Sequence, residues 1–147
     1  MNTVHSTSLA NIPILRRGKV RDVYDLGDDL LLVATDRISA YDVVMDEAIP
    51  EKGALLTSIS AWWFDRLSGV VPNHVVSTDV DQIENVTDEE RDMLRGRSMI
   101  VRRTTPLPVE CVVRGYLAGS GWREYQSSQT VCGVQLPGGL QQSEQIS

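Results

Sequence analysis

An arginine followed by a glycine-rich turn is the feature of this sequence that most directly suggests chemistry. Arg114 lies in an apolar run, and Ala118-Gly119-Ser120-Gly121 follows it a few residues later. Small residues let backbone N–H groups approach a ligand closely. The guanidinium and the Ser120 hydroxyl add further donors, so together these groups could clamp a phosphate. Taken by itself, the pattern favours the alternative, which is an ordinary turn beside an ion pair between Arg114 and Glu110.

A second candidate for phosphate binding is Gly18-Lys19, at the start of an expected strand. The glycine amide and the lysine ammonium could both contact the phosphates of a nucleotide. The P-loop pattern GxxxxGK[ST] is absent, so a plain turn glycine is the alternative. A third candidate is the polar loop over 35–42, because ligand contacts concentrate in loops at the ends of strands. The alternative for that loop is a surface segment held by an Asp–Arg pair.

Basic side chains gather in two clusters although the chain as a whole is acidic. The net charge of −6 argues against nucleic acid or an anionic membrane surface as the main partner. Local basic groups in an acidic protein suit small anionic ligands, and a solvated surface is the alternative for each cluster. The clusters are Arg16, Arg17, Lys19 and Arg21, and then Arg102, Arg103 and Arg114.

The elements that must position these residues are expected to be mostly strands. A β-hairpin is predicted from the runs over 19–24 and 30–34, and apolar residues at helical spacing predict a helix over 54–67, with Trp62 and Trp63 as core anchors. Residues 1–11 are expected to form a poorly ordered arm. Further expected elements are a β-like segment over 70–78, a capped helix beginning at Thr87 and ending at Gly96, strands over 98–103 and 109–113, and a helix over 121–126.

Length and composition indicate an ordinary soluble protein. The 147 residues are 41% apolar and 23% charged, which is enough for a hydrophobic core. No stretch approaches the length of a membrane span, and no basic region precedes a long apolar run at the N-terminus, so a cytoplasmic location is expected. Cys111 and Cys132 lack the spacing of metal ligands.

Four blocks of the sequence, in this order, resemble the SAICAR synthetase family, the phosphoribosylaminoimidazole-succinocarboxamide synthases. The blocks are RRGKVRDVYDLG over 16–27, TDRISAYDVVM over 35–45, IPEKGALLTSISAWWF over 49–64 and VECVVRGYLAGSGWREY over 109–125. The resemblance extends from about Ile12 to the end of the chain, and the longer, yeast-like branch is the closer match. It implies an α+β fold with an N-terminal antiparallel-sheet lobe over 1–104. Residues 105–147 would begin an ATP-grasp-like second lobe, after a hinge at Pro106 and Pro108.

The activity that this resemblance implies is that of an ATP-dependent ligase of purine biosynthesis. In the family, ATP phosphorylates the carboxylate of carboxyaminoimidazole ribonucleotide (CAIR). The amine of L-aspartate then attacks the acyl phosphate to give SAICAR, ADP and phosphate. The implied partners are therefore the small molecules ATP, CAIR and L-aspartate, with Mg²⁺ as cofactor and without nucleic acid or membrane. The oligomeric state is left open.

The resemblance also implies roles for individual residues. Lys19, at the ATP phosphates, and Glu110, near the imidazole end of CAIR, are the implied catalytic residues. The implied ATP-binding residues are Gly18, Lys19, Arg21, Val101, Arg102, Arg103 and Thr104, with the backbone over 101–104 holding adenine. The implied substrate-binding residues are Arg37, Ser39, Asp42, Arg114 and Ser120, the last two at the ribose 5′-phosphate.

One departure from the family concerns length, because the family continues well past the LPGGL segment over 136–140. The carboxylates that hold Mg²⁺ are expected beyond Ser147, so the 147-residue chain alone is expected to be inactive. One alternative is a non-catalytic nucleotide- or phosphate-binding fragment of that enzyme. Another is a kinase-like phosphotransferase, which the absence of HRD and DFG motifs disfavours.

Overall fold

The computed structural model describes residues 3–109 and 111–145. By its internal contacts the chain divides into two units, Met1–Thr105 and Pro106–Ser147. The first unit contains the main sheet and two of the α-helices, and the second contains one helix and a small hairpin. Each unit therefore has packing of its own.

The first unit is built on a five-stranded antiparallel sheet with the strand order β1-β2-β3-β7-β6. Its strands are β1 (Ile14–Arg17), β2 (Arg21–Asp25), β3 (Asp29–Ala34), β6 (Val75–Ser77) and β7 (Ser98–Arg102). The predicted hairpin is confirmed as β2–β3, and the predicted strand over 98–103 is confirmed as β7. Strand β1 was missed because its four residues, all exposed, show no alternation of buried and exposed positions.

One face of this sheet carries the hydrophobic core. Tyr24, Leu31 and Ile100 occupy paired positions on β2, β3 and β7, so their side chains share that face. Helix α2 (Asp88–Leu94), the short 3₁₀ helix η1 (Val80–Gln82) and the N-terminal segment cover it. The buried core side chains are Leu9, Ile12, Tyr24, Leu31, Val33, Val80, Ile83, Leu94 and Ile100.

The expectation of a poorly ordered N-terminal arm is wrong for the described residues 3–11. Leu9 is buried in the core, and the backbone N–H and hydroxyl of Thr7 both donate to the buried carboxylate of Asp22, each at 2.9 Å. An apolar face and a buried charge both need partners, and this segment supplies both. The predicted capping box is confirmed, because Thr87 and Glu90 exchange hydrogen bonds at the start of α2.

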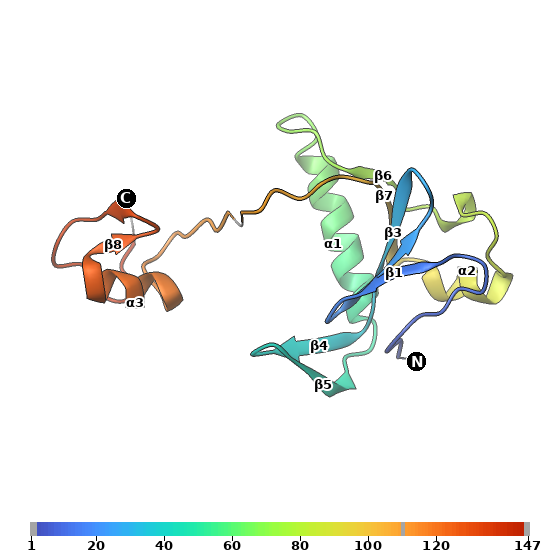
Figure 1. Ribbon diagram of the computed structural model, residues 1–147, viewed down its shortest axis with the longest axis horizontal. Helices are drawn as coiled ribbons and strands as arrows, with labels where there is room; N and C mark the ends of the chain where they lie inside the picture. Colours follow the sequence, from blue (N-terminus) through green and yellow to red (C-terminus); the bar gives the residue numbers. More distant parts are fainter. Residues whose placement is uncertain (1–2, 110, 146–147) are drawn as a thin grey trace. The chain divides into compact units, whose positions relative to one another are not determined.

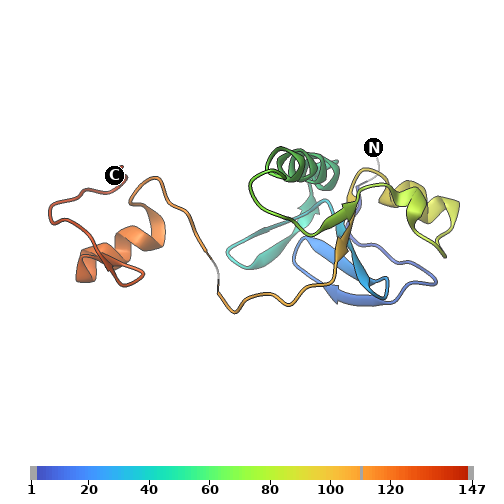
Figure 2. The ribbon, with the colours of Figure 1, turned by 90° about the horizontal axis from the view of Figure 1, so that it is seen from above.

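Helix α1 (Lys52–Arg66) lies on the opposite face of the sheet, so that α1 and α2 flank β3 and β7 (Figure 1). Its axis is seen nearly end-on in Figure 2. Gly53 permits the close approach, because a Cβ atom there would lie 2.2 Å from the carbonyl oxygen of Ala34. Gly53 and Thr57 are the buried positions of the helix, and Phe64 lies on the same side, two helical turns further on.

The expectation that Trp62 and Trp63 anchor the core is wrong in this chain. Their side chains are 57% and 51% exposed, and they pack edge to face against each other. The sheet side of α1 begins with the small residues Gly53 and Thr57, which allow the backbones to approach there. Apart from Phe64, the large apolar residues of the helix are exposed, namely Leu55, Leu56, Ile59, Trp62 and Trp63.

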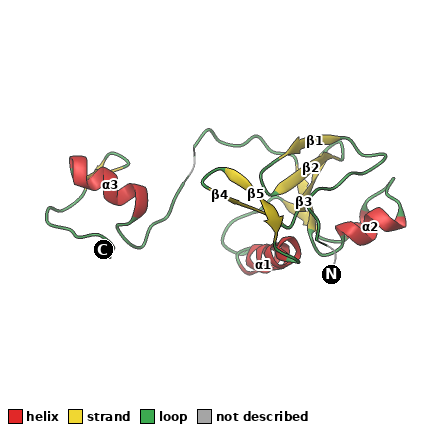
Figure 3. Ribbon diagram, turned by 90° about the horizontal axis from the view of Figure 1, so that it is seen from below, coloured by secondary structure: helices red, strands yellow, loops and turns green. Residues whose placement is uncertain are grey.

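A polar loop was expected over 35–42, but the structure has a second hairpin there. Strands β4 (Arg37–Ala40) and β5 (Val43–Ala48) pair antiparallel beside the main sheet (Figure 3). Tyr41 and Asp42 form the turn with φ values of 49° and 68°. Two positive φ angles are typical of a two-residue hairpin turn. The usual sequences of such turns are Asn-Gly and Asp-Gly, and the Tyr-Asp pair here does not match them, so the hairpin was not predicted.

The second unit contains helix α3 (Gly119–Ser128) and the short strands β8 (Thr130–Val131) and β9 (Val134–Gln135). Leu117 and Tyr125 are buried, and the Tyr125 hydroxyl donates to the carbonyl oxygen of Pro137 at 2.7 Å. The predicted helix over 121–126 is confirmed within α3. Gly119-Ser120-Gly121 forms the first turn of that helix.

The buried strand expected over 109–113 is not formed by the described residues of that range. Residues 109 and 111–113 are exposed and carry no strand assignment, and Glu110 lies outside the described residues. A strand needs a neighbour for its backbone N–H and C=O groups. Within the part of the chain that the structure describes, no strand pairs with this segment.

Candidate functional site

Gly18 and Lys19 form the tight turn between β1 and β2. The Gly18 N–H donates to the carbonyl oxygen of Arg21 at 2.7 Å, which closes the turn. The Lys19 side chain is 52% exposed, and its ammonium donates to a carboxylate oxygen of Asp42 in the β4–β5 turn. This hydrogen bond and the charge of Lys19 lower the pKa of Asp42. The structure thus brings together two residues that the sequence placed in separate candidate sites.

The guanidinium of Arg37 donates hydrogen bonds to the backbone of the same turn. Its Nη2 donates to the carbonyl oxygen of Gly18 at 2.9 Å, and its Nε donates to that of Lys19 at 3.0 Å. Nη2 also donates to Oδ1 of Asp22 at 2.9 Å, and Nη1 donates to the carbonyl oxygen of His5. The guanidinium is therefore occupied by acceptors of the protein itself.

Asp22 is a fully buried carboxylate on β2. Arg17 Nη1 donates to its Oδ2 at 3.2 Å, in addition to the bonds from Arg37 and Thr7. Burial opposes its ionisation, but the hydrogen bonds from Arg37 and Thr7 outweigh burial and lower its pKa. Nothing in the sequence pattern distinguished Asp22 from the other acidic residues of this exposed-looking segment.

Asp36 is a second buried carboxylate, at the start of the β4–β5 hairpin. Arg97 Nη1 and the Gly53 N–H donate to its Oδ1, each at 2.9 Å, and the Val4 N–H donates to its Oδ2 at 2.8 Å. Burial raises its pKa, whereas these hydrogen bonds lower it and prevail. The alternative for this loop was a surface segment held by an Asp–Arg pair, whereas the pair in the structure is buried and joins Asp36 to the distant Arg97. It connects the beginning of α1 with the residue just before β7.

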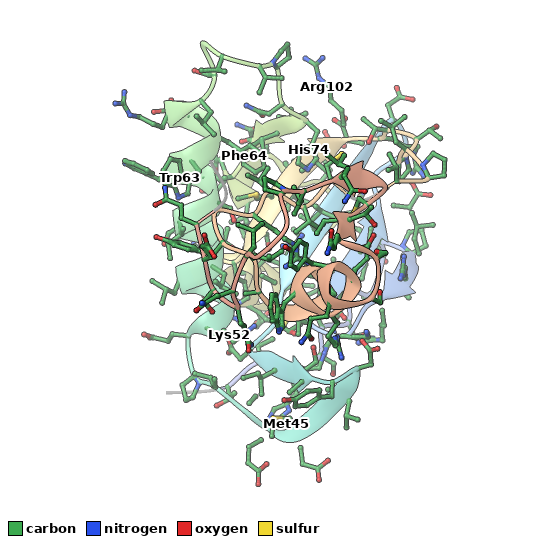
Figure 4. All side chains as sticks on the ribbon, turned by 90° about the vertical axis from the view of Figure 1, so that its left-hand side faces the viewer. Met45, Lys52, Trp63, Phe64, His74 and Arg102 are labelled. Atoms are coloured by element: carbon green, nitrogen blue, oxygen red, sulfur yellow. The ribbon has the colours of Figure 1, made fainter. Side chains whose placement is uncertain are left out.

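A cavity of about 710 Å³ lies where β7 ends. Arg102 and Thr104 line it, together with apolar side chains from the end of α1 and from the segment before β6. Phe64 and His74 meet there edge to face, with ring centroids 5.3 Å apart, and Figure 4 shows them beside Arg102. The lining residues are Phe64, Leu67, Val71, Pro72, Asn73, His74, Arg102 and Thr104. Its size and apolar walls are those of a small-molecule site.

A smaller cavity of about 140 Å³ lies between α1 and the sheet and shares Phe64 and His74 with the first. Its other walls include Arg21 from the candidate ATP-binding set, and Leu32 and Met99 from the sheet. Sequence analysis missed Phe64 and His74. The available signals were that Phe64 is the sole phenylalanine of the sequence and His74 one of two histidines.

Arg103 lies at the outer edge of this region. Its Nε donates to the carbonyl oxygen of Gly27 at 3.0 Å, and its Nη2 donates to a carboxylate oxygen of Asp25. The guanidinium therefore ties the segment after β7 to the β2–β3 turn. Val101, on β7 itself, is buried and is paired with Leu30 of β3 and Val75 of β6.

Arg114 and Ser120 lie together in the second unit, as the clamp hypothesis requires. Arg114 Nη2 donates to the Ser120 hydroxyl oxygen at 2.8 Å, and both residues are exposed. The arginine stem lies against the first turn of α3, since a Cβ atom at Gly121 would be in van der Waals contact with Cδ of Arg114, at 3.5 Å. The alternative pair with Glu110 lies outside the described residues.

Ser39 is the remaining candidate for substrate binding. Ser39 is half-buried on β4, opposite Val44 of β5.

Residues 3–109 and 111–145 contain no group of three or more His, Cys, Asp or Glu side chains that could hold a metal ion. Among the helices of this same part of the chain, none has the length and apolarity of a membrane span.

The fold defines the class to which this chain belongs, an α+β protein of the SAICAR synthase type. A solved structure of SAICAR synthase from Saccharomyces cerevisiae complexed with SAICAR matches with a TM-score of 0.86 at 41% identity, over 98% of this chain and 51% of that one. A second SAICAR synthase structure matches with a TM-score of 0.87 at 41% identity, with the same coverage. The fold class expected from the sequence is confirmed.

The family follows from the sequence comparison. The family model described as SAICAR synthetase matches residues 14–147, and the chain belongs to this family. Phosphoribosylaminoimidazole-succinocarboxamide synthase from Pelobacter propionicus is 54% identical over 143 residues, which are 97% of this chain and 48% of that protein. The enzyme of the same name from Syntrophotalea carbinolica is 56% identical with the same coverage. The chain therefore spans about half the length of the curated relatives it matches.

Proposed function

We propose that this chain forms the nucleotide-binding part of a cytoplasmic ATP-dependent ligase of purine biosynthesis. The reaction joins L-aspartate to the carboxylate of CAIR through an acyl phosphate and yields SAICAR, ADP and phosphate. The observation that carries the proposal is family membership together with identities of 54% and 56% to relatives that bear the name of this enzyme.

The geometry of the first unit supports ATP as the nucleotide. Val23 and Leu32 are paired across β2 and β3, and Leu30 and Val101 across β3 and β7, so these residues share the face opposite the core. Val23, Leu32 and Leu30 are only half-buried, which leaves apolar surface for the adenine base. The Lys19 turn adjoins one end of these strands and the Thr104 cavity the other. Five residue steps along β3 span roughly 17 Å, a length that suits an extended nucleoside triphosphate.

The roles proposed for this face follow from its chemistry. The backbone over 101–104 would hydrogen-bond adenine beside the cavity at Arg102, and Lys19 would neutralise the phosphates at the other end. Gly18 carries no side chain and would let the phosphates come close to the turn, and Arg21 would add charge. Binding of this kind is mostly positioning and charge neutralisation, which are the main contributions to phosphoryl transfer.

The second substrate is proposed to use the remaining candidates. A guanidinium, a hydroxyl and the first N–H groups of α3 are suitable donors for the ribose 5′-phosphate of CAIR, and Arg114 and Ser120 supply the first two. Ser39 and Asp42 of the β4–β5 hairpin would face the substrates, and Glu110 would orient the aspartate amine.

A lysine substitution tests nucleotide binding. Lys19→Met should weaken ATP binding about tenfold or more, because one charge-assisted contact to phosphate is lost. Isothermal titration with ATP and with adenosine measures this. Adenosine, which has no phosphates, should bind wild type and variant alike. Equal ATP affinities of wild type and variant would contradict the proposed role of Lys19.

The alternative function is a fragment that binds nucleotide without turnover, and the 48% coverage of the relatives favours it for the 147-residue chain by itself. ADP release with ATP, Mg²⁺, CAIR and aspartate distinguishes the two. We expect turnover from the intact gene product and none from a preparation whose mass is verified as 16.3 kDa. Turnover by that preparation would show that the chain alone is a ligase.

A further inference from the structure

Arg37 makes its contacts with the turn that carries Lys19, and this suggests a role different from substrate binding. Four hydrogen bonds from its guanidinium end on protein acceptors, namely the carbonyl oxygens of His5, Gly18 and Lys19 and the carboxylate of Asp22. Its side chain is only 13% exposed. A guanidinium has five N–H donors in a fixed fork, so one donor at most is left for a ligand.

The bonds to Gly18 and Lys19 constrain the part of the turn that a phosphate would approach. Carbonyl oxygens that point inward to Arg37 cannot point outward to an anion, and the Gly18 N–H is already used to close the turn. Lys19 consequently has a fixed backbone and a half-exposed side chain whose ammonium donates to a carboxylate oxygen of Asp42. Preorganisation of this kind lowers the entropy lost when a ligand binds.

Asp22 in turn fixes Arg37. The carboxylate is fully buried and keeps its charge through donors from Arg37, Arg17 and Thr7. Arg17 contacts the same carboxylate and the carbonyl oxygen of Thr7, but none of its contacts involves Gly18 or Lys19. The two arginines therefore share one partner and differ in whether they touch the turn.

We propose that Arg37 is a positioning residue that holds the Gly18–Lys19 turn in the conformation that presents the Lys19 ammonium to the phosphates of a nucleotide. This inference rests on the proposed nucleotide-binding function. In this proposal Arg37 does not contact CAIR directly, as the sequence resemblance implied. It affects ATP binding indirectly, through the position of Lys19.

The test compares Arg37→Lys with Arg17→Lys in the intact gene product. Lysine keeps the charge but lacks the fork, so Arg37→Lys loses bonds to the turn. Arg17→Lys instead loses bonds to Asp22 and to the carbonyl oxygen of Thr7, and none to the Gly18–Lys19 turn. We expect Arg37→Lys to raise the Kd and the KM for ATP about tenfold, the loss typical of one or two hydrogen bonds to charged groups. The KM for CAIR should stay unchanged, and Arg17→Lys should lower the melting temperature without changing either KM.

A double variant shows whether Arg37 acts through Lys19. If it does, Arg37→Lys should weaken ATP binding much less in a Lys19→Met background than in the wild type. Independent effects of the two substitutions, or a rise in the KM for CAIR instead of ATP, would overturn the inference. Equal ATP affinities of Arg37→Lys and Arg17→Lys would mean that Arg37 has only a structural role, and they would also overturn the inference. Absence of ATP binding by the wild type would instead contradict the proposed function itself.

Discussion

At the scale of single residues, two buried carboxylates organise the first unit. Asp22 joins the N-terminal segment, β1 and the β4–β5 hairpin through Thr7, Arg17 and Arg37. A buried charge is tolerated only when it is paired and hydrogen-bonded, so each of these segments is fixed by its bond to that carboxylate. The same residue therefore stabilises the fold and supports the turn that carries Lys19.

The two carboxylates make stability depend on pH. The pKa values of Asp22 and Asp36 are lowered in the folded protein. Their stabilising contribution is fully present above the pKa of an unfolded aspartate, about 3.9, and is lost as pH falls through the lower folded value. We expect the free energy of unfolding to fall below about pH 4, and Asp22→Asn to flatten this dependence. Urea denaturation at several pH values measures both.

An exposed carboxylate provides the control for this experiment. Asp28 lies in the β2–β3 turn and is exposed. Asp28→Asn should leave the pH dependence as it is in the wild type. The assignment to Asp22 would be contradicted if Asp22→Asn retained the steep loss of stability in acid.

At the scale of elements, the contact between α1 and the sheet depends on a missing side chain. Gly53 brings the first turn of α1 against Ala34 of β3, and its N–H donates to Asp36. The small residues Gly53 and Thr57 allow the backbones to approach, while most of the large apolar residues of the helix are exposed. The amphipathic pattern of α1 thus marks the side turned away from its own sheet.

Gly53→Ala should therefore be destabilising although alanine favours helices. The new Cβ atom would lie 2.2 Å from the Ala34 carbonyl oxygen and 2.8 Å from Arg97 Nη1. Because backbone must move to accommodate it, we expect a loss of about 2 kcal/mol in the free energy of unfolding. Thermal or urea denaturation measures this loss. Gly69→Ala is the matched control, since nothing lies within 4 Å of a Cβ atom there.

A stability of Gly53→Ala equal to that of Gly69→Ala would mean that α1 can shift away from the sheet at little cost. The tight contact at Ala34 would then not determine the position of the helix. In that case the bond from the Gly53 N–H to Asp36 would be the remaining constraint on the start of α1.

At the scale of the whole molecule, the division into two units has a consequence for folding. All residues of the buried core cluster belong to the unit Met1–Thr105, as do both buried carboxylates. A unit with its own core and its own satisfied charges can fold independently. The assignment of the two units to functional lobes stays a prediction.

We expect residues 1–105, made alone, to unfold cooperatively and at the same midpoint as the 147-residue chain. They should also bind ATP as tightly, because the proposed ATP site is built from this unit. Circular dichroism and isothermal titration measure the two properties. A gradual thermal transition of residues 1–105, with loss of ATP binding, would show that the first unit depends on the second.

The sequence by itself determined the family, the α+β class, the β2–β3 hairpin, strand β7, the capped helix α2 and the helical character of α1 and α3. Local signals carry these features: alternation of apolar residues, turn residues, a capping box and four ordered blocks. The proximity of Arg114 and Ser120 could also be anticipated, because they are six residues apart and one begins a helix. The proposed site roles remain predictions.

The tertiary structure alone decided which residues meet. Alternation along a strand cannot say that Asp22 is buried, that Arg37 crosses to the Lys19 turn, or that Lys19 reaches Asp42, because these contacts join distant positions in the chain. Nor can helical periodicity say which side of α1 faces the sheet. Apolar residues at helical spacing identify an apolar side of the helix, and the backbone contact at Gly53 decided that a different side faces the sheet.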